Sequence, residues 1–307
     1  MTALAHGGVG SGSAGYEPPA EPPAGMKKRR WVPYLLLLPG GLYLLVFFVY
    51  PMIQLIQTSL YDPSGSIEEG YAFTWQWSNY ADGLDIYGPQ FLRSLTYALI
   101  ATAICLVIGY PLAYAIAQKG GKWKNLLLVG VIAPFFTSFL VRTLAWKTIL
   151  SDHGYVVEFL KWLHILGPDD RLLATPFAVI AGLSYNFLPF MVLPLYASLE
   201  KLDPRLLEAS RDLYAGPVQT FRKVTLPLSL PGVIAGTLMT FIPAAGDYVN
   251  AELLGNPSTT MIGNVIQSRF LVVNDQPLAA SLSFMLMAGI LVMVFAYVRK
   301  AGTDEVV

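Results

Sequence analysis

Six long stretches of this chain carry no Asp, Glu, Lys or Arg, and they constrain the fold more than any other feature of the sequence. Each is rich in Leu, Val, Ile, Phe and Ala, and a helix needs about 17–25 apolar residues to cross the hydrocarbon core of a bilayer. Helices satisfy their own backbone hydrogen bonds in lipid. The sequence therefore predicts an all-α integral membrane protein with six transmembrane helices, within residues 31–61, 94–118, 125–141, 172–199, 224–246 and 276–298.

Composition agrees with a membrane location and excludes several other classes of protein. Hydrophobic residues make up 54% of the chain and charged residues 13%, against roughly 25% charged residues in soluble domains. Twenty basic residues balance twenty acidic ones, so bulk charge predicts no nucleic-acid partner. One cysteine, Cys105, and three dispersed histidines predict no metal site.

The positions of Lys and Arg predict the orientation, because short cytoplasmic segments of membrane proteins are enriched in both residues. With the N-terminus inside, fourteen of the twenty fall on the cytoplasmic side. The first outer loop, residues 61–90, is acidic and contains no basic residue. Both termini are therefore expected in the cytoplasm. The fourteen are Lys27, Lys28, Arg29, Arg30, Lys119, Lys122, Lys124, Lys201, Arg205, Arg211, Arg222, Lys223, Arg299 and Lys300.

The chain is expected to have one folded domain, residues 31–300, between two cytoplasmic tails, residues 1–30 and 301–307. The Gly, Pro, Ala and Ser residues of the first tail predict disorder. The uncharged but polar segment 253–268 is expected to form a short interfacial or re-entrant helix, not a seventh span. Aromatic residues of loop 61–90 suggest an interfacial belt, or simple anchoring to the interface.

Motifs of covalent chemistry are missing from the sequence. Gly121-Lys122 is followed by Trp123, and Ile116 stands where a P-loop has its first glycine. No nucleophile elbow or zinc-protease helix is present. The chain is therefore expected not to be an enzyme. Gly232 and Gly236 are spaced for close contact between two helices.

The loop between the fourth and fifth charge-free stretches, residues 198–231, is expected to form two short helices. Pro204 can begin the first, and Gly216-Pro217 interrupts it. A second amphipathic piece follows, with Phe221 among its apolar residues. Such a pair could dock a cytoplasmic partner; the alternative is a pair that binds only lipid headgroups.

The residues of this loop that match a known pattern are Glu208, Ala209, Ser210, Asp212, Leu213, Ala215, Phe221, Leu226, Pro227, Pro231 and Gly232. They resemble the EAA loop of ABC importer permeases, which docks into a groove on the ATPase subunit. Ser210 replaces an alanine of that pattern, and Tyr214 stands where a glycine is usual, so we expect Gly216 to supply the turn. The resemblance assigns ATPase coupling to Glu208, Ala209, Ser210, Asp212, Leu213, Tyr214, Gly216 and Phe221.

A wider resemblance covers roughly residues 30–300 and is carried by residues 134–146, 186–204, 246–255 and 261–270. These segments are similar to the spermidine/putrescine-type permeases of the ABC importers. The resemblance implies the type I permease fold and a multi-pass location in the bacterial inner membrane. It also implies four kinds of partner: the lipid bilayer, a second homologous permease subunit, two ATPase subunits that use ATP and Mg, and an extracytoplasmic substrate-binding protein. This chain itself is expected to bind no cofactor.

Asp247 is the first candidate for contact with a transported solute, because an ionisable group at membrane depth is expensive and usually functional. A helix starting at Pro231 would place it about 24 Å along the axis. With Tyr248 and Asn250 nearby, the carboxylate would suit an amine cation. Alternatively, Asp247 reaches the outer interface or pairs with Arg142. Further candidates for the pathway, with simple packing as the alternative for the aromatic ones, are Glu252, Tyr185, Phe135 and Phe136.

Two other functions compete with an importer permease for polyamines or a related small solute. A secondary transporter driven by an ion gradient would be built from inverted repeats, which the sequence does not show, and it would not need a docking loop. A membrane-embedded enzyme would need clustered catalytic side chains, which the six stretches do not offer. We therefore expect the permease, with the secondary transporter as the alternative.

Overall fold

The structure, a computed structural model, describes residues 32–66, 68 and 70–301. Within these residues the chain is helical, and its only extended pairings are two isolated bridges, Tyr61 with Phe73 and Ser66 with Gly70. The all-α prediction is confirmed. The predicted tail 1–30 lies outside the described residues, as does all of the tail 301–307 except Ala301. The chain divides into two compact units, Met1–Pro51 and Met52–Val307.

The first unit holds α1 (Val32–Leu44) and a π-helical turn, η1 (Leu45–Val49). At its end the helix continues into α2 (Tyr50–Ser59), so that one apolar helix covers Leu35–Ser59. Side chains from Leu35 to Tyr50 are all exposed. A helix that is apolar on every face is expected to be surrounded by lipid or by other apolar helices.

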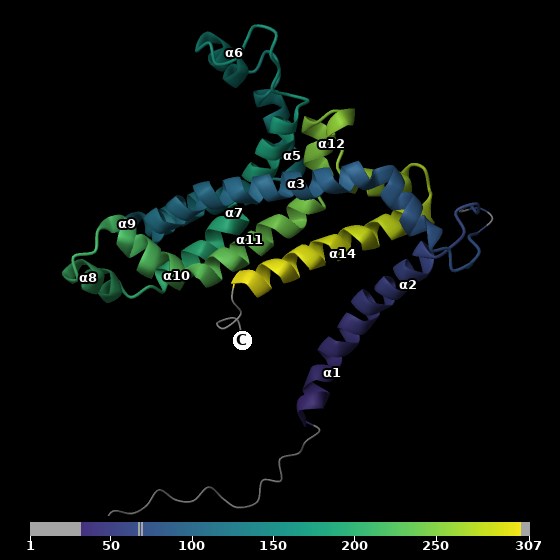
Figure 1. Cartoon of the computed structure of the whole chain (residues 1–307), viewed down its shortest axis with the longest axis horizontal. Coiled ribbons are helices and arrows are strands. Elements are labelled where there is room, and N and C mark those ends of the chain that lie inside the picture. Colours follow the sequence, from purple (N-terminus) through teal and green to yellow (C-terminus); the bar gives the residue numbers. More distant parts are fainter. Residues whose placement is uncertain (1–31, 67, 69, 302–307) are drawn as a thin grey trace, which may run out of the picture. The chain divides into compact units, whose positions relative to one another are not determined.

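Four long helices of the second unit lie side by side (Figure 1): α3 (Ser78–Tyr114), α7 (Pro176–Glu200), α11 (Leu230–Ala245) and α14 (Gln276–Ala301). Helix α3 continues through η2 (Ala115–Lys119). Helix α7 packs against both α3 and α11 and supplies fully buried side chains such as Leu183, Met191 and Leu195. Many apolar side chains on the outside of α3 and α14, such as Val107 and Phe295, are exposed, as expected of surfaces that face lipid.

Two glycines allow α11 to approach α7 closely. A Cβ atom on Gly232 would lie 2.6 Å from the Cβ of Ser198, and one on Gly236 would lie 2.9 Å from the Sδ of Met191. Any larger residue would force the helices apart. The spacing of these glycines therefore has the packing role expected of small residues in membrane helices.

Two of the six predicted spans are bent. The third consists of η3 (Gly121–Trp123), α4 (Lys124–Ile132) and η4 (Ala133–Phe136), followed after a bend of 93° by α5 (Phe139–Ile149). The fifth consists of α9 (Pro217–Thr220), η5 (Phe221–Thr225) and α10 (Leu226–Leu228), with a bend of 66° before α11. The described residues thus contain four unbroken candidate spans, or six when each bent pair counts as one.

One predicted loop was too long. Residues 61–90 are not all loop, because α3 begins at Ser78 and includes Tyr80 and Tyr87. Charged residues indicate which part of a helix lies outside the hydrocarbon core and not where the helix ends. Asp82 and Asp85 therefore lie on α3 together with its apolar part. Segment 253–268, predicted to be short and helical and not a span, is divided among α12 (Val249–Leu254), η6 (Pro257–Thr259) and α13 (Ile262–Leu271), none of which is a candidate span. The remaining helices are α6 (Tyr155–Trp162) and α8 (Pro204–Asp212).

Candidate functional site

Asp247 lies in the short connection between α11 and α12. This end of α11 is the one farther from residues 198–231, which are called the coupling loop below. Gly246 caps α11, and only 8% of the Asp247 surface is exposed. Its Oδ1 accepts two hydrogen bonds from Asn250, one from the backbone N–H at 2.8 Å and one from Nδ2 at 3.1 Å. Its Oδ2 accepts none from the described residues. One carboxylate oxygen is therefore fixed, and the other lacks a donor.

The hydrogen bonds of Asn250 continue to two neighbouring helices. Asn186 on α7 donates from Nδ2 to Asn250 Oδ1 at 3.0 Å and to Thr143 Oγ1 on α5 at 3.2 Å. All three side chains are almost fully buried. Asn186 and Thr143 were not among the predicted site residues; their only signal in the sequence was an amide between Tyr185 and Phe187 in an otherwise apolar stretch.

Arg142 does not form an ion pair with Asp247. Its guanidinium lies over the rings of Phe135 at 4.8 Å and Phe139 at 5.7 Å, which favours a cation electrostatically. The residue is 8% exposed, and its Nε and Nη1 have no hydrogen-bond partner in the described part of the chain. The structure thus gives Arg142 aromatic neighbours, and Asp247 has no ion-pair partner among the described residues.

Glu252 and Tyr248 lie near Asp247 on the same short segment, and Asn264 of α13 joins them. Asn264 Nδ2 donates to the backbone oxygen of Tyr248 at 2.8 Å and to Glu252 Oε2 at 3.2 Å. Glu252 and Asn264 line an open cavity of about 510 Å³ together with Tyr87 and Arg269. Glu252 is therefore a second carboxylate on the segment that follows Asp247, and it lines this cavity.

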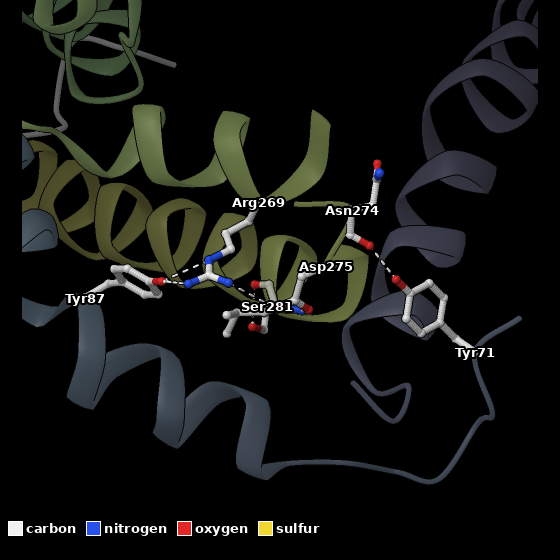
Figure 2. Close-up of polar contacts among 7 residues, drawn as sticks. Tyr71, Tyr87, Arg269, Asn274, Asp275 and Ser281 are labelled. Atoms are coloured by element: carbon white, nitrogen blue, oxygen red, sulfur yellow. Dashed lines mark hydrogen bonds and ion pairs between the residues drawn. The ribbon is translucent and has the colours of Figure 1, made fainter. Parts of the chain in front are cut away.

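A polar cluster beside this cavity ties α13 to α3 and to the start of α14. Figure 2 shows Arg269 pointing to Tyr87, whose hydroxyl accepts from Nε at 2.9 Å, and to Asp275, at 3.7 Å from Nη1. Tyr71 donates from its hydroxyl to the backbone oxygen of Asn274. Because Asp275 pairs with Arg269, this cluster holds the helix ends together and does not supply a free charge.

The acidic loop before α3 keeps its negative charge. The backbone N–H of Ser64 donates to Asp62 at 2.9 Å and holds the pKa of this exposed carboxyl below its usual value. Exposed acidic groups of one sign raise the local concentration of cations.

The aromatic candidates occupy different surroundings. Phe135 packs edge-on against Phe190 at 5.1 Å and under Arg142, whereas Phe136 is 87% exposed. Tyr185 packs against Trp146 at 5.4 Å and lines an apolar cavity of about 450 Å³ between α3, α5 and α7. The structure therefore does not place Phe136 or Tyr185 among the hydrogen-bonded neighbours of Asp247.

The coupling loop forms two helices, as predicted, but its turn differs from the prediction. Gly216 is extended, with φ −67° and ψ 163°, and Tyr214 adopts the left-handed conformation with φ 57°. Ala215 N–H donates to Ser210 O at 3.1 Å and Tyr214 N–H to Arg211 O at 2.9 Å, which is the Schellman pattern of helix ends. Gly216 does not supply the turn, because these two bonds place the left-handed residue at position 214.

Side chains of the coupling loop divide into an exposed set and an anchoring set. Leu213 and Tyr214 are 81% and 98% exposed, and Glu208, Ala209 and Asp212 are exposed as well. Ser210 is buried and shares a 2.9 Å hydrogen bond with Thr220, which joins α8 to α9. Phe221 packs edge-on against Tyr110 of α3 at 5.5 Å. The loop is thus fixed to the bundle and presents apolar side chains to its surroundings.

Comparison with protein families matches residues 106–301 to the family described as binding-protein-dependent transport system inner membrane component. The chain is 42% identical over 260 residues to the spermidine/putrescine transport system permease protein PotB of Escherichia coli (strain K12), covering 84% of this chain and 94% of that protein. The PotB protein of Haemophilus influenzae is 40% identical over 258 residues, covering 84% and 90%.

Solved structures of two transporters have a similar fold. One is a bacterial ABC transporter involved in the import of the acidic polysaccharide alginate, with a TM-score of 0.63 and 20% identity over 89% of this chain and 96% of that chain. The other is the MetNI methionine ABC transporter, with a TM-score of 0.53 and 18% identity over 70% and 95%. At these identities the likeness concerns the fold, which is that of type I importer permeases.

Proposed function

Because this chain belongs to the family of binding-protein-dependent transport system inner membrane components, we propose that it is the permease subunit of an ABC importer for polyamines such as spermidine and putrescine. The observation that carries the proposal is the 42% identity to the E. coli spermidine/putrescine permease over 84% of this chain. The chemistry of the site agrees with it, since Asp247 offers a carboxylate oxygen without a donor and no residue described here neutralises its charge.

The partners in this proposal are a second homologous permease subunit, two ATPase subunits and an extracytoplasmic substrate-binding protein. The exposed apolar side chains Leu213 and Tyr214 on the coupling loop support docking of an ATPase. ATP and Mg would be bound by the ATPase subunits. This chain would bind no cofactor and catalyse no covalent reaction.

The orientation in this proposal places both termini and the coupling loop in the cytoplasm. Support comes from the fourteen Lys and Arg residues on that side and from the acidic first loop on the other. Asp247, Tyr248, Glu252 and the adjoining cavity then lie toward the outer face. Released amine cations would meet the acidic loop first and Asp247 afterwards.

Transport would proceed by alternating access. Closure of the ATPases on ATP would carry the two coupling loops with them, and the two permease subunits would rock between inward- and outward-facing states. Asp247 would hold an ammonium group through Oδ2 while the alkyl part of the polyamine lies against apolar side chains, Phe135 among them. Tyr185 and Phe136 have different surroundings. They would line another part of the transport path or only pack against neighbouring side chains.

The test is uptake by the complete importer in proteoliposomes, with radiolabelled spermidine delivered by its binding protein. We expect uptake that requires ATP and all four kinds of subunit and that vanadate inhibits. Uptake by this chain alone, driven by an ion gradient, would show a secondary transporter instead. ATP-dependent uptake of another solute, with none of spermidine or putrescine, would refute the polyamine assignment but not the importer.

A further inference from the structure

A continuous row of hydrogen-bonded side chains connects α5, α7 and α12, and it ends at Asp247. Thr143 donates to the backbone oxygen of Phe139 at 3.1 Å and accepts from Asn186. Asn186 also donates to Asn250, and Asn250 donates to Asp247. No side chain of the row is more than 8% exposed. Water therefore competes little for these bonds. The Nδ2 of Asn186 makes both of its bonds within the row, and its Oδ1 is buried with no partner among the described residues.

The direction of every bond in the row follows from the carboxylate. An ionised Asp247 can only accept, so the NH₂ group of Asn250 must face it. The oxygen of Asn250 then faces α7, and Asn186 must present its own NH₂ group there. The second N–H of Asn186 is taken by Thr143, whose hydroxyl hydrogen is already given to Phe139. Asn186 thereby fixes the orientation of the Asn250 side-chain amide, which supplies one of the two hydrogen bonds on Asp247 Oδ1; the backbone N–H of Asn250 supplies the other.

The other groups around Asp247 do not fix its second oxygen. The ion pairs among the described residues join Lys124 to Glu200, Arg171 to Asp152 and Arg269 to Asp275, and Arg142 lies over aromatic rings. Oδ2 of Asp247 has no hydrogen-bond partner in the described part of the chain and is not among its fully buried unpaired atoms, so this oxygen is open to a ligand. The geometry thus leaves one oriented acceptor position for a cationic donor.

We propose that Asn186 is a positioning residue: acting through Asn250, it aims Oδ2 of Asp247 at the ammonium group of the transported amine. This role rests on the proposed function. Helix α7 contributes no charge to the site. In this role it nevertheless controls how the site receives the cation. Loss of the Asn186 amide would free the Asn250 side chain to rotate. Asp247 Oδ1 would then keep only the bond from the Asn250 backbone N–H, about which the carboxylate could turn and move Oδ2.

The experiment is a double-mutant cycle in the reconstituted importer, with spermidine-loaded binding protein in excess and uptake normalised to assembled complex. We expect Asn186→Leu to lower maximal uptake about tenfold, with the KM for loaded binding protein unchanged. Asp247→Asn should lower it at least as far. In the Asp247→Asn background, Asn186→Leu should lower uptake less than about twofold further, because its effect passes through Asp247.

Two further variants keep the test decisive. Asn250→Ala removes the link directly and should reproduce the effect of Asn186→Leu; it replaces that variant in the cycle if the latter does not assemble. Thr240→Val removes a buried hydroxyl that has no partner among the described residues and should leave uptake unchanged. A tenfold loss that persists in the Asp247→Asn background would overturn the positioning role. Absence of spermidine uptake by the unmutated importer would instead overturn the proposed function, and with it this role.

Discussion

Tyr214 is the clearest case of a residue whose conformation differs from its chemical preference. A left-handed backbone costs a residue with a Cβ atom about 1 kcal/mol relative to glycine. Tyr214 adopts φ 57° at the end of α8 and exposes 98% of its surface. None of the described residues covers the ring, so their contacts do not compensate the strain.

Replacing Tyr214 by glycine should therefore stabilise the end of α8 by about 1 kcal/mol. Hydrogen exchange at the Ala215 amide, which bonds to Ser210 O, should slow about fivefold. Tyr214→Ala is the matched control, because it removes the ring but keeps the strain, and its exchange should not slow. Equal exchange rates in all three proteins would contradict a strained Tyr214.

The sequence located Asp247 but not the residues that orient it. A carboxylate in an apolar stretch stands out by its charge, whereas Asn186 and Thr143 are neutral and do not. The partners of Asn186 are 43 and 64 residues away, and such long-range pairing cannot be read from local spacing. The left-handed Tyr214 was also missed, because its side chain gives no sign of a turn.

Close contact between α7 and α11 depends on small residues. Gly236→Ala would place a Cβ atom 2.9 Å from Met191 Sδ and 3.0 Å from Met191 O. Because the backbone oxygen cannot move aside alone, the helices must separate, at a cost of about 1–3 kcal/mol. Gly289→Ala on α14 is the control, since nothing lies within 4 Å of its Cβ position. Thermal unfolding in detergent should show a lower midpoint for the first variant only, and equal midpoints would refute the packing argument.

The coupling loop should carry the contact with the ATPase without contributing to the fold of the bundle. Glu208 is exposed on α8, so Glu208→Lys should reduce the ATPase recovered with the purified permease about tenfold or more, while the thermal midpoint of the permease stays unchanged. Glu158→Lys makes the same charge reversal on an exposed residue of α6 and should leave recovery normal. Full recovery and uptake with Glu208→Lys would count against docking at this loop.

Hydropathy predicted where the helices lie but not whether they are straight. The stretch 125–141 is long enough for one span, yet the chain bends by 93° between Phe136 and Phe139. Pro134 was a signal for a break, but the size of the bend depends on packing against α7 and α12. The start of α3 at Ser78 was also not predicted, because hydropathy reports apolar content and the first turns of this helix are polar.

The orientation of the whole chain can be tested with its single cysteine as background. Cys105 is fully buried and should react little with a membrane-impermeant maleimide. Ser64→Cys and Gln219→Cys place thiols at exposed positions in the acidic loop and in the coupling loop. In spheroplasts only Ser64→Cys should be labelled, and Gln219→Cys should react after permeabilisation. The opposite pattern would reverse the proposed topology.

The partner subunits were predicted from family resemblance and not from composition. A net charge of zero indicates no charged partner, and an apolar surface that contacts lipid has the same composition as one that contacts another subunit. The fold class and the family were available from the sequence and are confirmed. The arrangement of subunits depends on surfaces contributed by other chains, about which this sequence has no information.

The hydrogen-bonded row from Thr143 to Asp247 also sets an order of events during biosynthesis. Asn186 is translated and enters the bilayer before Asn250 exists, with Thr143 as its only partner in the row. An unpaired amide in hydrocarbon is costly, so the third and fourth spans should stay together as a hairpin until α12 arrives. A nascent chain that stops before Val249 would leave one N–H of Asn186 without its acceptor on Asn250, an additional unpaired donor in the membrane by which proteolytic quality control could recognise unfinished copies.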